Sequence, residues 1–222
     1  MDNMNIKITR KNIKNMYIRV KPPNGDVFVS APNHISQSEI DEFISSHIDW
    51  IEDKRRDILN GKIKAPLKYN TGDTVYLWGE EFKLQLVKQN PLKKVLVDWD
   101  EHVIYMQISK KTSIKKREKT LYDFYKEELY KKLPSLLDKC TKIVGESPRD
   151  VKVRKMKNWG NCNQNREITL NSKLASKDLK CVEYVLIHEL CHLIEFNHSP
   201  DFKKLMDKYC PDWRSLKKRL NE

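Results

Sequence analysis

The sequence His188-Glu189-Leu190-Cys191-His192, followed by His198, most constrains how this chain can fold. Residues 179–187 before it are largely apolar and the pattern continues to Ile194, which predicts a mostly buried helix. Positions i and i+4 of a helix lie on one face about one turn apart, so His188 and His192 can bind the same metal ion. A buried face that carries two imidazoles needs a polar partner, which a metal ion and water would supply. The motif therefore predicts a metal site on a core helix.

Glu189 and His198 extend this pair into a candidate catalytic site. Glu189 follows the first ligand, where its carboxylate can take a proton from water and act as general base. A continuous helix would place His198 about 9 Å along the axis from His192, so the helix must end between them. Asn197 can adopt the left-handed conformation that ends helices, and Ser199-Pro200-Asp201 is typical of the start of another helix. Three protein ligands leave a fourth position for water, which is typical of catalytic zinc.

Glutamates downstream of His192 are the competing source of a third ligand. Only Glu195 and Glu222 follow it in the sequence. We expect Glu195 on the same short helix, where it is better placed to orient a metal ligand than to bind the ion. His198 is therefore the expected third ligand, with Glu195 and Asn197 supporting the ligands from behind.

Further motifs lie on both sides of the metal-binding helix. They are Val153-Arg154-Lys155-Met156-Lys157, Trp159-Gly160-Asn161-Cys162, Ile168-Thr169-Leu170-Asn171, residues 184–192, Asn197-His198-Ser199, Phe202 and Cys210-Pro211-Asp212-Trp213, with residues 27–32 and Trp50-Ile51 in the first half. In combination they resemble the YgjP-like metallopeptidases, relatives of the SprT-like zinc proteases. The resemblance implies zinc bound by His188, His192 and His198, with Glu189 as the catalytic base. The chain departs from the family pattern where Asn158 stands in place of a basic residue and Asn161 in place of a serine.

Hydrophobic patterning predicts an α+β fold whose β-rich N-terminal half precedes a helical half with a small antiparallel sheet. The resemblance implies that this helical half is a zincin-like catalytic domain. The expected elements are three strands within residues 4–32, a helix from about 36 to 60, four strands within 74–108, a long helix from 120 to 144 that Pro134 kinks, two strands within 151–171, and three C-terminal helices. A basic stretch at Lys110-Lys111 suggests a boundary between a 1–110 region and a 111–222 metallopeptidase domain.

Composition limits the environment and the partners. The five cysteines form no C-x-x-C pair, which argues against a disulfide framework or a zinc ribbon, although Cys162 could lie near the site. No apolar run approaches the roughly 20 residues that cross a bilayer, and residues 1–4 lack a signal-peptide pattern, so we expect a cytoplasmic protein with no membrane partner. The net charge of +12 favours an anionic partner such as nucleic acid, with simple solvation by scattered lysines as the alternative.

Substrate contacts are predicted from the segment before the metal-binding helix. Ile168, Thr169 and Leu170 alternate as in a strand, and an extended peptide could pair with that strand if it lies at a sheet edge; an ordinary amphipathic strand is the alternative. Arg154 and Trp159 are further candidate substrate contacts. Arg154, Tyr184 and Tyr209 are candidates for the donor that stabilises the oxyanion, and the sequence does not choose among them.

The motif and its surroundings predict a zinc metallopeptidase that hydrolyses peptide or protein substrates, with Glu189 as general base. Two alternatives stay open. One is a metal-dependent amidase or hydrolase that does not act on proteins, because the same site activates water against any polarised carbonyl. The other is a basic, DNA-associated scaffold with a latent metal site, although an intact Glu189 has little purpose at a purely structural site.

Overall fold

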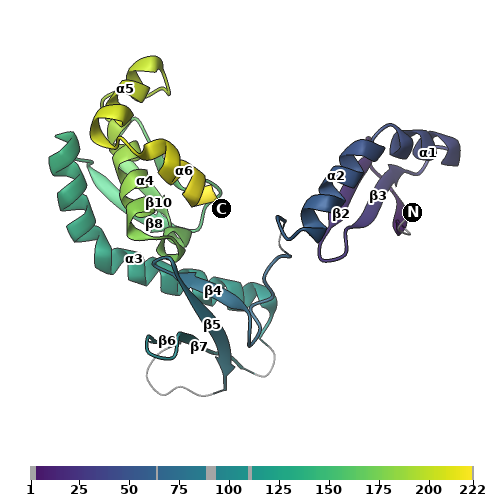
Figure 1. The fold of residues 1–222 in the computed structure, drawn as a ribbon, viewed down its shortest axis with the longest axis horizontal. Helices are drawn as coiled ribbons and strands as arrows, with labels where there is room; N and C mark the ends of the chain where they lie inside the picture. Colours follow the sequence, from purple (N-terminus) through teal and green to yellow (C-terminus); the bar gives the residue numbers. More distant parts are fainter. Residues whose placement is uncertain (1–3, 64, 89–93, 110–111, 222) are drawn as a thin grey trace. The chain divides into compact units, whose positions relative to one another are not determined.

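A computed structural model describes residues 4–63, 65–88, 94–109 and 112–221. The chain forms two compact units, residues 1–67 and 68–222 (Figure 1). The boundary predicted at Lys110-Lys111 falls on residues outside the described part, and the chain on both sides of it belongs to the second unit. The α+β class is confirmed. No helix among the described residues is long and apolar enough to cross a membrane.

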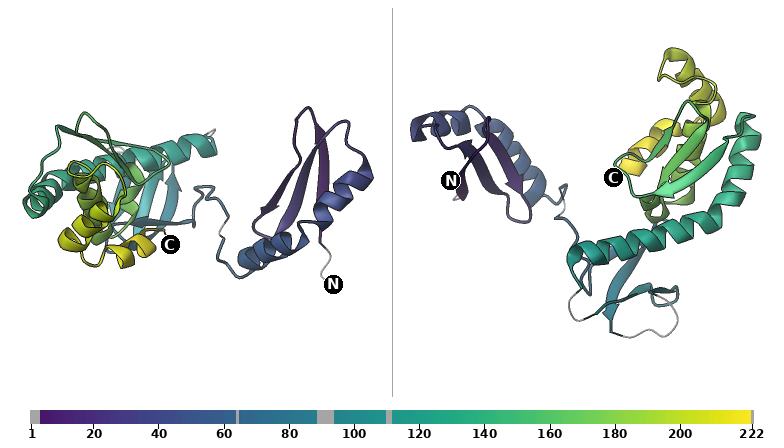
Figure 2. Two further views of the ribbon diagram at one scale, coloured as in Figure 1. Left: turned by 90° about the horizontal axis from the view of Figure 1, so that it is seen from above. Right: turned by 180° about the vertical axis from the view of Figure 1, so that it is seen from behind.

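The first unit is a three-stranded sheet with two helices on one face (Figure 2). Its elements are β1 (Ile6–Lys11), β2 (Tyr17–Lys21), β3 (Asp26–Pro32), α1 (Gln37–Ser45) and α2 (Ile48–Leu59). β3 is central, parallel to β1 and antiparallel to β2. Val27, Val29 and Ala31 on its inner side pack against Ile40 and Ile51 of the helices. This alternation of buried and exposed side chains gives the unit a core of its own.

Residues 36–60 form two helices, so the single predicted helix is wrong. α1 begins with a capping box in which Ser36 and Glu39 bond to each other's backbone amides. The break lies at Ser46 and His47: Ser46 Oγ donates to the Phe43 carbonyl at 3.0 Å, and His47 Nδ1 lies 2.8 Å from the same oxygen. These side chains bond to carbonyls at the end of α1, which favours a break there over a continuous helix.

The second unit begins with a four-stranded sheet followed by one long helix. Its strands are β4 (Thr74–Leu77), β5 (Glu80–Val87), β6 (Val95–Asp98) and β7 (Val103–Gln107), in the order β4-β5-β7-β6. These are the four strands predicted from residues 74–108. α3 (Ile114–Val144) is bent along its length (Figure 2) and contains Pro134, which lacks the amide that would bond back into the helix. α3 starts before the predicted residue 120 because Ser113 caps it by accepting from Lys116 N at 3.3 Å.

The remaining elements form a second sheet and three C-terminal helices. They are β8 (Asp150–Arg154), β9 (Gly160–Cys162), β10 (Glu167–Asn171), a 3-10 helix η1 (Ser172–Ser176), α4 (Leu179–Cys191), α5 (Pro200–Tyr209) and α6 (Trp213–Asn221). The sheet has three strands in the order β8-β10-β9, with β10 parallel to β8 and antiparallel to β9. The two strands predicted within residues 151–171 are present as β8 and β10, but β9 joins them, and the sheet is mixed where an antiparallel one was expected. The return from β8 to β10 leaves room for the short strand β9, which the pattern of apolar residues did not reveal.

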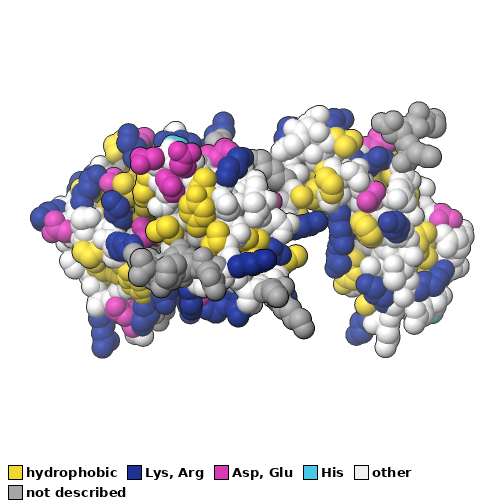
Figure 3. Space-filling model, turned by 90° about the horizontal axis from the view of Figure 1, so that it is seen from below, with side chains coloured by type: hydrophobic (Ala, Val, Ile, Leu, Met, Phe, Trp, Pro, Cys, Tyr) yellow, Lys and Arg dark blue, Asp and Glu magenta, His cyan; other side chains and the backbone are white. Residues whose placement is uncertain are grey.

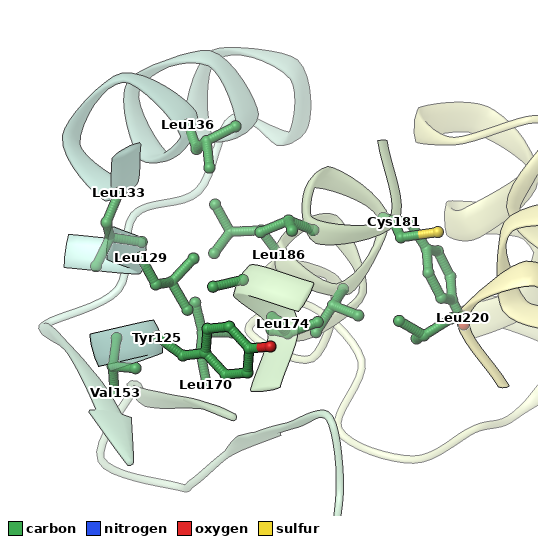
Figure 4. Packing of buried hydrophobic residues seen from close by; sticks show 14 of the residues in the cluster. Tyr125, Leu129, Leu133, Leu136, Val153, Leu170, Leu174, Cys181, Leu186 and Leu220 are labelled. Atoms are coloured by element: carbon green, nitrogen blue, oxygen red, sulfur yellow. The ribbon is translucent and has the colours of Figure 1, made fainter. Parts of the chain in front are cut away.

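One core holds the second unit together. Leu129, Leu133 and Leu136 of α3 face Leu170 of β10 and Leu186 of α4 (Figure 4), and all of them are buried. Tyr125 adds a hydrogen bond between α3 and β4, in which its hydroxyl donates to the Tyr76 carbonyl at 2.6 Å. α4 is thus enclosed by the small sheet and by α3, which fixes the helix that carries the metal-binding motif.

Candidate metal centre and active site

α4 places His188 and His192 one turn apart at its C-terminal end. Asp178 caps the other end by accepting from Cys181 N at 3.1 Å. The helix ends at Cys191, and short turns follow, in which Ile194 N and Glu195 N both donate to the Cys191 carbonyl. The helix ends before His198, as predicted, but not through the left-handed residue that we expected. Asn197 is not among the described non-glycine residues with positive φ, so the left-handed residue expected there is wrong.

The three predicted histidines converge. One ring nitrogen from each of His188, His192 and His198 can be chosen so that all three lie within 4.8 Å of one another. The Nε2 atoms of His188 and His198 are 3.1 Å apart. The chain returns because Ser199 caps α5, with Pro200 in its first turn. Within the described part of the chain no other group of three potential metal ligands has this arrangement.

The residues behind the imidazoles fix their orientation. His192 Nδ1 lies 3.2 Å from the Glu195 carbonyl, so Nε2 is left to face the other two rings. Glu195 therefore acts through its backbone and lies beyond the helix, not on it as expected. Its carboxylate accepts from Asn197 N at 3.3 Å, which ties the two predicted supporting residues to each other.

Phe202 is a member of the site whose role the sequence did not indicate. Its ring is 97% buried and packs against all three imidazoles, with centroid distances of 4.9 Å to His188, 4.5 Å to His192 and 4.9 Å to His198. Ser199 positions it, because the Ser199 hydroxyl accepts from Phe202 N at 3.2 Å. The only sequence signal at this position is an N-cap serine three residues before Phe202. That spacing predicts the start of α5 but does not indicate that the ring packs against the metal ligands.

Burial favours the neutral form of His188 and His192. It lowers the pKa of His188 to about 3, with the neighbouring His192 and His198 adding to the effect. Burial also lowers the pKa of His192, against the raising effect of the Glu195 carbonyl. Neutral imidazoles are the form that binds a metal ion, and three of them suit a divalent metal of the first transition row. The donor set therefore fits the metal ion expected from the motif.

Glu189 lies between α4 and the small sheet. Its side chain is 4% exposed, and burial raises the pKa of the carboxyl to about 8 in the protein alone. A cation held by the adjacent histidines would act in the opposite direction and favour the carboxylate. An ideal Cβ on Gly160 of β9 would lie 2.4 Å from Glu189 Oε1 and 2.8 Å from both Cγ and Cδ. Only glycine permits this approach, so β9 presses its backbone against the carboxylate.

The predicted substrate strand is not at an edge. β10 is bonded to β8 on one side and β9 on the other, and Ile168, Thr169 and Leu170 are 0%, 9% and 0% exposed. The edge-strand hypothesis is therefore wrong for these three residues, because both backbone edges of β10 are already paired. The strand beside α4 with an edge that no described strand pairs is β9.

The other residues predicted to contact the substrate or the oxyanion differ in whether they adjoin the residues that build the site. Trp159 directly precedes β9, and its Nε1 donates to Asn221 Oδ1 of α6 at 3.1 Å. Arg154 ends β8, which β10 separates from β9, and its side chain is exposed. Tyr184 lies one turn before His188, with ring centroids 6.0 Å apart, and burial raises its hydroxyl pKa to about 12. Tyr209 ends α5 under the ammonium of Lys208. Of the four, Trp159 and Tyr184 are next to residues that build the site.

All five cysteines are buried and unpaired, as expected. Cys162 is in β9, and burial together with the Glu189 charge raises its thiol pKa. A thiol with a raised pKa holds its proton and is a poor nucleophile. Cys162 is therefore a packing residue of the strand rather than a catalytic group.

Comparison with known proteins places the chain among metallopeptidases. Residues 14–222 match the sequence profile of the family described as YgjP-like, metallopeptidase domain. The chain belongs to the YgjP-like metallopeptidase family. The family implies a metal ion and hydrolysis of peptide bonds, and the histidines of this YgjP-like chain could bind that ion. A search of curated proteins found no match. Among solved structures, the crystal structure of the metallopeptidase zymogen of Pyrococcus abyssi abylysin is similar at 26% identity and a TM-score of 0.37, covering 39% of this chain and 90% of that one.

Proposed function

We propose that this chain is a zinc-dependent peptidase in which His188, His192 and His198 hold the metal and Glu189 is the general base. The observation that carries the proposal is the convergence of three imidazoles beside a buried carboxylate, next to the open edge of a short strand. Zinc is the expected ion because three histidines with a fourth position left open are typical of catalytic zinc. When bound, zinc supplies a Lewis acid and lowers the pKa of water at the site.

The substrate is expected to lie along β9. β9 pairs with β10 through one edge only, so its other edge offers backbone groups to an extended peptide. Gly160 keeps this strand against Glu189, which would bring a scissile bond bound to β9 close to the base. This replaces the predicted pairing with Ile168–Leu170 by pairing with the neighbouring strand.

Glu189 would carry the proton in both halves of the reaction. Its carboxylate takes a proton from the attacking water, holds it at the carboxyl, and then donates it to the nitrogen of the leaving amine. The pKa of about 8 in the protein alone shows how strongly its surroundings favour the protonated form, which suits the donating half. A cation in the adjacent site favours the charged form that the accepting half requires. The two effects act on one group that has to work in both directions.

A digest of peptides tests the proposal against the amidase alternative. The zinc-loaded chain is incubated with a mixed library of peptides of ten or more residues and, separately, with small acyl amides, and products are followed by mass spectrometry. We expect internal cleavage of peptides, with short amides turned over far more slowly because they cannot pair with β9. Equal or faster turnover of the small amides would reject a peptidase and favour the amidase.

A further inference from the structure

The outer face of the first unit's sheet carries charge of mainly one sign. It consists of the side chains that point away from α1 and α2, namely Lys7, Thr9, Lys11, Tyr17, Arg19, Lys21, Asp26, Phe28 and Ser30. Four of these are cations and Asp26 is the one acid. The opposite side of the sheet packs against the helices, and within the unit no helix covers the outer face. Figure 3 shows Lys and Arg side chains spread over the face of the molecule drawn there, so the arrangement of charges on the sheet matters more than the total charge.

Apart from Asp26, the acids among the described residues of this unit lie on α1 and α2. α1 carries Glu39, Asp41 and Glu42 and no basic residue. The basic residues of α2 include Arg56, which pairs with Asp53 of the same helix. By contrast, none of the four cations of the outer face forms an ion pair with any described residue. A concentration of unpaired positive charge on an open face favours an anionic ligand.

Aromatic rings lie among these cations. Register places Lys7, Phe28 and Arg19 side by side across the three strands, so Phe28 is at the centre of the row. The ammonium of Lys21 lies 4.4 Å from the Phe28 ring centroid and that of Lys7 lies 5.6 Å from it. Tyr17, in the next row, is 48% exposed. Cations and aromatic rings thus alternate on one flat surface, where a phosphate and its base could be held together.

We propose that the outer face of the β1-β3-β2 sheet binds single-stranded nucleic acid. The cations contact phosphates, and Tyr17 and Phe28 stack against bases. A single strand fits better than a duplex, because stacked and paired bases do not present their faces to an aromatic side chain. An acidic peptide or an anionic membrane would use the charges, but neither offers a planar base that stacks against the rings. The proposal is independent of the peptidase activity.

Fluorescence anisotropy of the full-length chain with a labelled 12-nucleotide oligothymidine tests it over a range of salt concentrations. The triple variant Lys7→Gln, Arg19→Gln, Lys21→Gln should weaken binding by at least 10-fold at low salt. Each lost phosphate contact on a single strand lowers the slope of log K against log salt by about 0.7, so the slope should fall by about 2. Phe28→Leu should weaken binding on the order of 10-fold and leave the slope unchanged, since it removes stacking but no charge.

The matched control removes three charges from α2 and the segment that follows it in the same unit. Lys54→Gln, Arg56→Gln, Lys62→Gln should bind as tightly as the wild type. Asp26→Asn removes the one acid from the outer face and should strengthen binding several-fold, a gain that a misfolded variant would not give. Equal losses in both triple variants would overturn the proposal, as would equal binding of duplex DNA, polyglutamate or anionic phospholipid vesicles.

Discussion

Gly160→Ala tests the contact between β9 and the catalytic base. The added Cβ would lie 2.4 Å from Glu189 Oε1, where an ordinary contact needs at least 3.4 Å, so about 1 Å of movement is required. The carboxylate tip alone could rotate away, but Cγ and Cδ are each 2.8 Å from the same position. The whole Glu189 side chain must therefore shift, and it is 4% exposed with little room to do so.

A displacement of this size should act on catalysis and not on metal binding. A misplacement of about 1 Å at a reacting group costs on the order of 100-fold in rate, or about 2.7 kcal/mol of transition-state stabilisation. The three atoms nearest to the added Cβ all belong to Glu189 and none to a histidine, so zinc affinity should change little. We therefore expect kcat/KM to fall about 100-fold with stoichiometric zinc retained.

Steady-state cleavage of a peptide substrate, with zinc content measured on the same samples, gives the answer. Asn165→Ala is the control, because its exposed side chain lies in the turn between β9 and β10, outside the strand edge proposed to bind the substrate. In the Gly160→Ala background, Glu189→Asp shortens the crowded side chain, so the combined loss should be smaller than the product of the single losses. Wild-type activity in Gly160→Ala with full zinc content would refute the packing of the base against β9.

Three other predictions concern the framework of the site. Phe202→Ala should lower the free energy of unfolding by about 3–5 kcal/mol in urea titrations of the metal-free chain, because it removes a buried ring that packs against three imidazoles. A loss of under about 1 kcal/mol would contradict this. Asp178→Ala removes the cap of α4 and a 2.7 Å ion pair with Arg219, and it should lower the free energy of unfolding by about 1–2 kcal/mol in the same assay. Arg219→Gln removes the exposed ion pair alone and should cost under about 1 kcal/mol. Equal costs for the two variants would exclude the cap as the cause. Burial raises the pKa of the Cys140 thiol to about 12, so unfolding releases a proton and the free energy of unfolding should fall as the pH rises from about 9 towards 12. The thiols of Cys191 and Cys210 contribute to the same fall, so Cys140→Ala should reduce it by the share of one thiol, and an unchanged pH profile would contradict this.

The candidate metal ligands could be predicted because their signal is local. His188 and His192 are one helical turn apart in any helix, and the N-cap at Ser199 marks the return that brings His198 back. The strands other than β9 also followed from the pattern of apolar residues, as at Val27 and Val29. Each of these features depends on residues close together in the chain.

Features that depend on pairing between distant segments could not be predicted. The pattern Ile168-Thr169-Leu170 describes a strand but not its neighbours, and only the register with β8 and β9 makes it central. The contact of Gly160 with Glu189 joins residues that have no sequence signal in common. The sequence did not reveal the division of the chain after Leu67, because the basic stretch at Lys110-Lys111 suggested a boundary there instead. The packing of α3 against β6 keeps the chain on both sides of that stretch in one unit.

The most direct test of the proposed mechanism compares wild type with Glu189→Gln, a change that keeps the size of the side chain and removes its ability to take a proton. Zinc is measured by atomic emission and peptide cleavage by mass spectrometry on the same purified samples. We expect about one zinc per chain in both proteins and a loss of at least about 100-fold in cleavage by Glu189→Gln. Cleavage by Glu189→Gln within a few-fold of wild type, or no stoichiometric metal in either protein after remetallation, would contradict the account.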